Sequence, residues 1–197
     1  ALPLKPIMIG PMSTLTATAK PHLAPRTFWT GLVVLLLVTV ALRTAALEAV
    51  PPGLTHDEAA NGHDAAAILN GDLRLYFSVG YGREPLYQYT VAAATALLGQ
   101  SIFTLRVTSV GWSLLTWALT VALARRWWGR RAALVVGLAM TASFWALMVA
   151  RIGLRATTLP PLFTAAILAY DHALAGAARV AGAAKRPAWH AYGHAYG

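Results

Sequence analysis

Apolar residues fill most of this chain in long runs, and polar residues are concentrated between the first two of these runs. The apolar runs cover residues 28–47, 85–99, 102–124, 132–150 and 159–170. The first holds twenty residues interrupted only by Arg43, which is close to the length that a helix needs to cross about 30 Å of hydrocarbon. The run at 85–99 is short for a full crossing. The pattern predicts an all-α, polytopic transmembrane helical bundle.

The polar stretch from residue 55 to residue 87 holds five of the seven acidic residues in the chain. Thr55 and Glu58 have the spacing of a capping box, so a helix is predicted over residues 56–70, with Gly71 as its stop. Two sets of side chains share separate faces of this helix, a polar set of Asp57, Asn61 and Asp64 and an apolar set of Ala65, Ile68 and Leu69. We expect an amphipathic helix that lies along a bilayer surface and offers its polar face to water.

Composition supports the membrane class. The chain is 57% hydrophobic and 12% charged, and its mean hydropathy is +0.55. A net charge of +9 could favour nucleic acid, but the basic residues form short clusters between apolar runs and no basic stripe, so we expect no nucleic-acid partner. The absence of cysteine excludes disulfides, thiolate metal sites and a cysteine nucleophile.

Basic residues before the first run set the expected orientation. Residues 1–27 contain Lys5, Lys20 and Arg26 and no acid, which predicts a loose cytoplasmic leader followed by an uncleaved signal anchor rather than a cleaved signal peptide. The positive-inside rule then places the loop at 48–84 outside the plasma (inner) membrane. Residues 174–197 are of low complexity and are predicted to be disordered. We expect the chain to be the N-terminal fragment of a longer protein.

The predicted crossings conflict with one another. Residues 125–131 (RRWWGRR) are typical of a cytoplasmic loop, whereas Arg83 and Arg151 are candidates for an external face. An odd number of crossings must separate Arg83 from residue 125, yet two apolar runs lie between them. Three alternatives stay open: the run at 85–99 does not cross, the arginine cluster is external, or Arg151 is cytoplasmic.

Candidate chemistry is found at the ends of the apolar runs. Asp57 and Glu58 are adjacent carboxylates, which could serve only to complement the dipole of the predicted helix. Arg83 and Glu84 precede the second run, so both signs of charge are expected near one membrane surface. This combination favours transfer of a sugar from a lipid phosphate, in which a carboxylate accepts the proton of the acceptor and an arginine binds the departing phosphate.

Three segments resemble the dolichyl-phosphate-mannose-protein mannosyltransferase-like glycosyltransferases of the GT-C superfamily. They are HDEAANGHDAAAILNG, GREPLYQYTVAAATALLG and the stretch that runs from LRVTSVGW to ARIGLRATTLPPLF, within residues 28–173. The resemblance implies an integral membrane enzyme, inverting in mechanism, that uses a polyprenyl-phosphate sugar donor and a protein, lipid or glycan acceptor. The fragment alone is expected to be inactive.

The resemblance also implies roles for individual residues. Asp57 matches the acidic residue of the first external loop, which acts as catalytic base or positions the acceptor, and Glu58 follows it. Arg83, Arg151 and Arg155 are expected to bind the donor phosphate, and Glu84 and Asp64 to support the active face. The chain departs from many relatives at residues 156–158, where Ala-Thr-Thr stands in place of an aspartate.

A divalent metal is an open alternative. Plausible ligands are His56, Asp57, His63, Asp64 and Glu84, but their spacing matches no defined site, and we predict no metal residue among them. His190 and His194 belong to the predicted disordered tail.

Other polar and aromatic residues have simpler expected roles. Arg43 and Arg106 are expected to snorkel to the interface, the alternative being that they face the protein interior. The tryptophans are expected to be interfacial anchors or packing residues. Two further functions stay open, a noncatalytic membrane assembly subunit and a transporter fragment.

Overall fold

The computed structural model describes residues 24–78 and 82–180, and almost all regular structure there is helical. An isolated antiparallel bridge joins Phe77 to Arg83. The elements in chain order are α1 (Pro25–Thr44), α2 (His56–Leu69), α3 (Pro85–Leu98), α4 (Ile102–Ala142), α5 (Phe144–Arg151), the 3₁₀ helix η1 (Arg155–Thr158) and α6 (Leu159–Val180). The predicted all-α class is confirmed. Most of the predicted leader and the tail with His190 and His194 lie outside the described residues.

Helix α4 folds back on itself at Gly129. The backbone there has φ 87° and ψ −175°, a conformation that glycine adopts without steric cost. The two arms pack against each other, since the Trp117 indole donates to the Gly137 carbonyl at 3.0 Å and to the Thr141 hydroxyl at 3.2 Å. The runs predicted at 102–124 and 132–150 are therefore the arms of a helical hairpin, and α5 continues the second arm after Ser143.

The long helices form the body of the molecule. Helix α1 lies along the hairpin, and its Thr39 hydroxyl meets the hydroxyl of Thr141 at 2.6 Å. Their shared core consists of Phe28, Trp117, Val121, Ala124 and Ala133. Large apolar side chains on the outer side of α1, such as Val33 and Leu37, are more than half exposed, as expected for a helix that faces lipid.

Two helices, α1 and α4, are long and apolar enough to cross a membrane. Helix α5 and the helical segment from Arg155 to Ala177, bent by 118° at their break, are a third candidate if they form one span. These helices suggest a membrane protein. Helix α6 continues to Val180, past the predicted tail boundary at residue 174, because alanine, leucine and arginine in this stretch favour helix.

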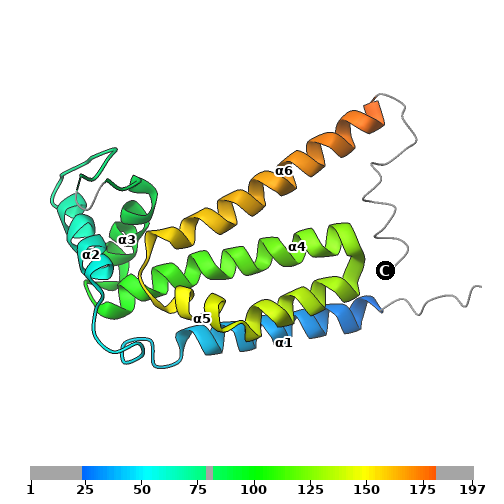
Figure 1. Ribbon diagram of the computed structural model, residues 1–197, viewed down its shortest axis with the longest axis horizontal. Coiled ribbons are helices and arrows are strands. Elements are labelled where there is room, and N and C mark those ends of the chain that lie inside the picture. Colours follow the sequence, from blue (N-terminus) through cyan, green and yellow to red (C-terminus); the bar gives the residue numbers. More distant parts are fainter. Residues whose placement is uncertain (1–23, 79–81, 181–197) are drawn as a thin grey trace, which may run out of the picture.

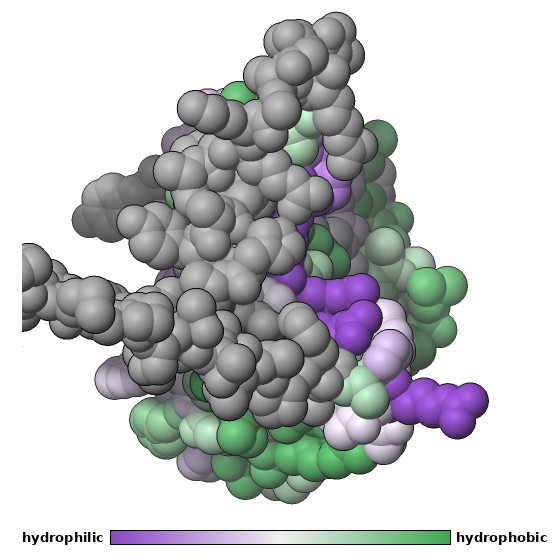
Figure 2. All heavy atoms as spheres, turned by 90° about the vertical axis from the view of Figure 1, so that its right-hand side faces the viewer, coloured by the Kyte–Doolittle hydropathy of each residue, from purple (hydrophilic) through white to green (hydrophobic). Residues whose placement is uncertain are grey.

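Helices α2 and α3 lie side by side at one end of the molecule (Figure 1), whereas the start of α1 and the bend of α4 lie at the other. Helix α3 has 14 residues, about 21 Å, which is too short to cross the hydrocarbon. One arm of α4 therefore separates Arg83 from the arginine cluster. Of the three alternatives for the conflicting crossings, the structure favours the one in which the run at 85–99 does not cross. Figure 2 shows the molecule from the end with the α4 bend. At the sides of this view, hydrophilic residues lie between hydrophobic ones.

The predicted interfacial helix packs differently from expectation. Ala65 and Ile68 of α2 are buried against Tyr87 and Val91 of α3, and Leu69 is 48% exposed. The polar face is also largely covered by the protein, since Asn61 is 1% exposed. The prediction that this face is offered to water holds only at its first turn. Beyond the first turn, protein covers most of both the polar and the apolar face of α2, because α3 and the residues after α5 pack against this helix.

Candidate functional site

The site is built around the first turn of α2, which begins as the sequence predicted. The Thr55 hydroxyl accepts the backbone N–H of Glu58 at 3.2 Å, and the Glu58 carboxylate accepts the N–H of Thr55 at 2.9 Å. This reciprocal pair satisfies two N–H groups that have no partner within the helix. The helix ends within a residue of the predicted stop, and Gly71 has φ 93°. The capping box and the stop are confirmed.

Glu58 lies in the protein interior. Its carboxylate accepts the Nε–H of Arg106 at 2.8 Å, and both side chains are fully buried. Burial raises the pKa of Glu58, but hydrogen bonds from Arg106 and from the backbone N–H groups of Thr55 and Gly153 outweigh burial and lower the pKa overall. Glu58 was predicted beside Asp57 as a catalytic candidate, but its contacts favour a structural role as the ion-pair partner of Arg106.

Arg106 and Arg43 do not snorkel, which corrects that expectation. Both are fully buried, and Arg43 donates to the Ser113 hydroxyl at 3.1 Å and to the Met140 carbonyl at 3.2 Å. Arg106 donates to backbone carbonyls of the loop that follows α1, those of Leu47, Glu48, Pro51 and Gly53. For Arg106, carboxylate and carbonyl oxygens replace the water that its charge would otherwise bind, whereas Arg43 Nη1 is buried without a hydrogen-bond partner within the described residues.

Arg151 also binds the end of α1. Its guanidinium donates to five backbone carbonyls, those of Leu42, Arg43, Ala45, Ala46 and Val50. The last carbonyls of a helix have no partner within that helix, and Arg151 supplies one. Arg151 is 6% exposed. Its predicted role in binding the donor phosphate would require breaking these bonds, so its contacts favour a structural role.

Asp57 is the carboxylate of α2 that remains open. Its side chain is exposed, and it has no hydrogen bond or ion pair within the described part of the chain. It lies one helical turn before Asn61 on the same face, and the Asn61 amide donates to the Gly153 carbonyl at 2.8 Å. Asp57 therefore shares the helix face on which Asn61 binds the segment between α5 and η1, and η1 begins with Arg155.

Arg83 and Asp64 form a second buried pair. The Arg83 guanidinium donates to the Asp64 carboxylate at 3.1 Å, and the two side chains are 5% and 7% exposed. Arg83, which was predicted to bind the donor phosphate, is thus paired with Asp64, which was predicted to support the active face. A phosphate would have to displace Asp64 to reach this guanidinium.

Arg155 is the accessible arginine of the predicted phosphate set. Its guanidinium pairs with the Glu84 carboxylate, and the side chains are 40% and 78% exposed. The backbone N–H of Glu84 and the guanidinium of Arg155 lower the pKa of Glu84, so this carboxylate is ionised at neutral pH. The pair connects the start of α3 to η1 at the end of the molecule where α2 begins.

Sequence reasoning missed the buried polar side chains of α3. Gln88 is fully buried and donates to the Asn61 amide oxygen at 3.3 Å, and the Tyr87 hydroxyl meets that of Ser109 at 2.7 Å. Burial raises the pKa of Tyr87, so its hydroxyl stays protonated. A polar side chain within an apolar run needs a hydrogen-bond partner, and this rule could have identified Tyr87 and Gln88 in the sequence as residues with buried polar contacts.

Metal ligands are not brought together. In the part of the chain that the structure describes, no three histidine or acidic side chains are close enough to hold one ion. Two of the candidate ligands are paired with arginines, Asp64 with Arg83 and Glu84 with Arg155.

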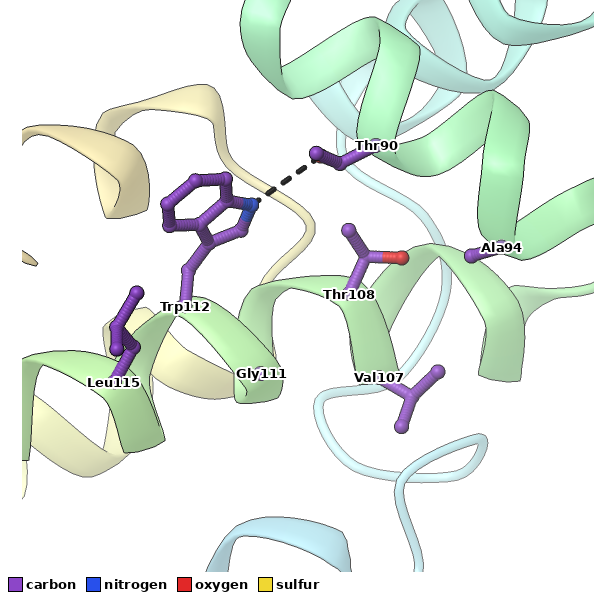
Figure 3. Close-up of a pocket in the computed structure, with 7 residues that line it drawn as sticks. All are labelled: Thr90, Ala94, Val107, Thr108, Gly111, Trp112 and Leu115. Carbon is purple, nitrogen blue, oxygen red and sulfur yellow. Dashed lines mark hydrogen bonds between the residues drawn. The ribbon is translucent and has the colours of Figure 1, made fainter. Parts of the chain in front are cut away.

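An apolar groove lies between α3 and α4 (Figure 3). Its volume is about 370 Å³, and its walls include Thr90 and Ala94 of α3 and Val107, Trp112 and Leu115 of α4. The Trp112 indole donates to the Thr90 hydroxyl at 3.2 Å across the groove, so Trp112 is a packing residue.

Comparisons of the chain with known protein families, with curated proteins and with solved structures found no match.

Proposed function

We propose that the protein is a membrane glycosyltransferase that moves a sugar from a polyprenyl-phosphate donor to an acceptor on the extracytoplasmic side, similar to the mannosyltransferase-like enzymes of the GT-C superfamily. The observation that carries this proposal is that two candidate residues of opposite charge stay accessible on elements that hydrogen bonds hold together. Asp57 of α2 is exposed and unpartnered within the described residues, and the accessible Arg155 lies two residues beyond Gly153, whose backbone α2 binds.

The proposed reaction is a single displacement. Asp57 accepts the proton of an acceptor hydroxyl or amine as that atom attacks the anomeric carbon of the sugar. The bond from that carbon to the phosphate oxygen breaks, and polyprenyl phosphate leaves with the electron pair. Arg155 binds the phosphate through two charge-assisted hydrogen bonds, which its exposed pair with Glu84 does not prevent. One displacement inverts the anomeric configuration.

The groove between α3 and α4 offers an apolar surface for the polyprenyl chain. It opens beside the membrane-spanning candidate α4, where such a chain would be dissolved in the bilayer.

The proposal requires that the end with α2 faces the outside and the α4 bend faces the cytoplasm. Because the chain has no cysteine, single cysteines can test this. Asn70 is exposed at the end of α2, and Trp128 is 44% exposed beside the bend. In intact cells we expect an impermeant maleimide to label the Asn70→Cys variant, and to label Trp128→Cys only after permeabilisation. Labelling of both without permeabilisation would contradict this orientation.

Replacing Arg155 with lysine tests donor binding. Lysine keeps the charge but cannot form the paired bonds of a guanidinium. The loss of one charge-assisted bond, about 1.5–3 kcal/mol, should raise the apparent donor constant about tenfold or more and slow turnover. Titration of the intact protein with a labelled polyprenyl-phosphate sugar measures both.

Arg74 offers a matched control, because it is also exposed and also pairs with a carboxylate, that of Asp72. We expect Arg74→Lys to behave like the parent. If Arg155→Lys leaves the donor constant and turnover unchanged as well, Arg155 does not bind the phosphate.

A second candidate is a noncatalytic assembly subunit that kept the fold. It is favoured by the number of predicted site residues that have structural partners, namely Glu58, Asp64, Arg83 and Arg151. The Ala-Thr-Thr sequence at 156–158 agrees with it. A full-length protein that is correctly inserted but transfers no sugar would support this candidate.

A further inference from the structure

A single residue, Gly153, is bound by α2 through both of its backbone polar groups. The Gly153 N–H donates to the Glu58 carboxylate at 3.1 Å, and the Gly153 carbonyl accepts the Asn61 amide at 2.8 Å. Glu58 is 0% and Asn61 1% exposed, so water does not compete for these bonds. The residues between α5 and η1 cannot slide or turn relative to α2 without breaking one of them.

Each of the two α2 side chains is in turn held by a different helix. Arg106 of α4 fixes the Glu58 carboxylate at 2.8 Å, and Gln88 of α3 donates to the Asn61 amide oxygen at 3.3 Å. Glu58 and Asn61 are three residues apart on α2 and so face the same side. Gln88 supplies the buried Asn61 amide oxygen with a donor, while its own amide oxygen is buried without a hydrogen-bond partner in the part of the chain that the structure describes.

Gly153 lies close to Glu58 and has no unusual backbone conformation. A Cβ atom there would lie 3.2 Å from Glu58 Cγ and 3.6 Å from a Glu58 carboxylate oxygen. The close approach of the backbone to Glu58 thus depends on the absence of a side chain.

The bound segment connects two functional positions. Asp57 precedes Glu58 in α2, and Arg155 follows Gly153 by two residues. Within residues 24–78 and 82–180, the Arg155 side chain pairs with one carboxylate, that of the exposed Glu84, and exposed pairs fix geometry weakly. The backbone bonds at Gly153 are therefore the stronger constraint on where Arg155 lies relative to Asp57.

We propose that Glu58 and Asn61 are positioning residues that clamp the backbone N–H and carbonyl of Gly153, and so set the separation between the base Asp57 and the phosphate-binding Arg155. This inference rests on the proposed function, but the clamp itself can be tested without an activity assay.

The first test measures geometry. Ala59 in α2 and Ala156 in η1 are both exposed, so spin labels on Ala59→Cys and Ala156→Cys report the distance between the two elements by electron paramagnetic resonance. We expect a narrow distribution in the parent and a broadened or shifted one in Asn61→Leu. Asn70→Leu, the same change at the exposed asparagine that caps the C-terminus of α2, should match the parent.

A second variant guards against a folding defect in Asn61→Leu. Gly153→Ala should also displace the segment, because its new methyl group meets Glu58, whereas Gly176→Ala has open space around the added atom and should not. Unchanged distributions in both Asn61→Leu and Gly153→Ala would overturn the clamp.

The activity test separates positioning from folding. In the intact protein, Asn61→Leu should raise the apparent donor constant and lower turnover by up to about 10²-fold, because a displacement of about 1 Å is enough for such a loss. A variant that merely contains less folded protein loses rate without changing the donor constant. A parent that transfers no sugar, combined with a broadened distribution in Asn61→Leu, would overturn the proposed function and leave the clamp standing.

Discussion

Replacing Asp57 with asparagine is expected to lower sugar transfer by about 10²–10⁴-fold. The exposed Asp57 carboxylate is the proposed base, and the amide of asparagine cannot accept the proton of the acceptor. The substitution keeps the size of the side chain. Asp57 has no hydrogen bond or ion pair within the described residues, so insertion and stability should change little. Transfer of a labelled sugar by the intact protein, compared at equal amounts of inserted protein, measures the effect.

Asp72→Asn is the matched control. Asp72 is a partly exposed carboxylate in the loop after α2 and pairs with Arg74 in solvent, where such pairs contribute about 1 kcal/mol or less. We expect this variant to transfer sugar like the parent. If Asp57→Asn also transfers at the parental rate, Asp57 only complements the dipole of α2, and the proposed base must be abandoned.

Local signals in the sequence were sufficient for α2. The capping box of Thr55 and Glu58 and the glycine at 71 act within one or two turns, so the helix could be predicted almost to the residue. The lengths of the apolar runs likewise identified α1 and both arms of α4. Gly129 was not recognised as the bend because the arginines and tryptophans around it are equally compatible with a loop.

The roles of the charged residues depend on contacts between distant segments and could not be predicted. Glu58 and Arg106 are 48 positions apart, and Asn61 and Gly153 are 92 apart. A charge next to an apolar run can reach water or face a buried partner, and the sequence does not distinguish these outcomes. Of the residues predicted for chemistry, the structure leaves Asp57, Glu84 and Arg155 accessible and buries the others.

The burial of Glu58 with Arg106 predicts a large loss of stability when one partner is removed. Arg106→Met leaves the Glu58 carboxylate buried without its guanidinium and the loop after α1 without its donor. Breaking a buried ion pair in this way typically costs about 3–5 kcal/mol. Denaturant unfolding of the purified protein in detergent, followed by the loss of helix, measures the change in the free energy of unfolding.

A double variant shows how much of that cost comes from the unpaired carboxylate. Glu58→Gln together with Arg106→Met removes both charges, so it should be more stable than Arg106→Met alone, although the loop carbonyls still lack their donor. Arg74→Met, at an exposed arginine that also pairs with an aspartate, should cost about 1 kcal/mol or less. If Arg106→Met is no more destabilising than Arg74→Met, the Glu58–Arg106 pair does not hold α2 against α4. The proposed clamp at Gly153 would then lack the rigid Glu58 carboxylate on which it depends.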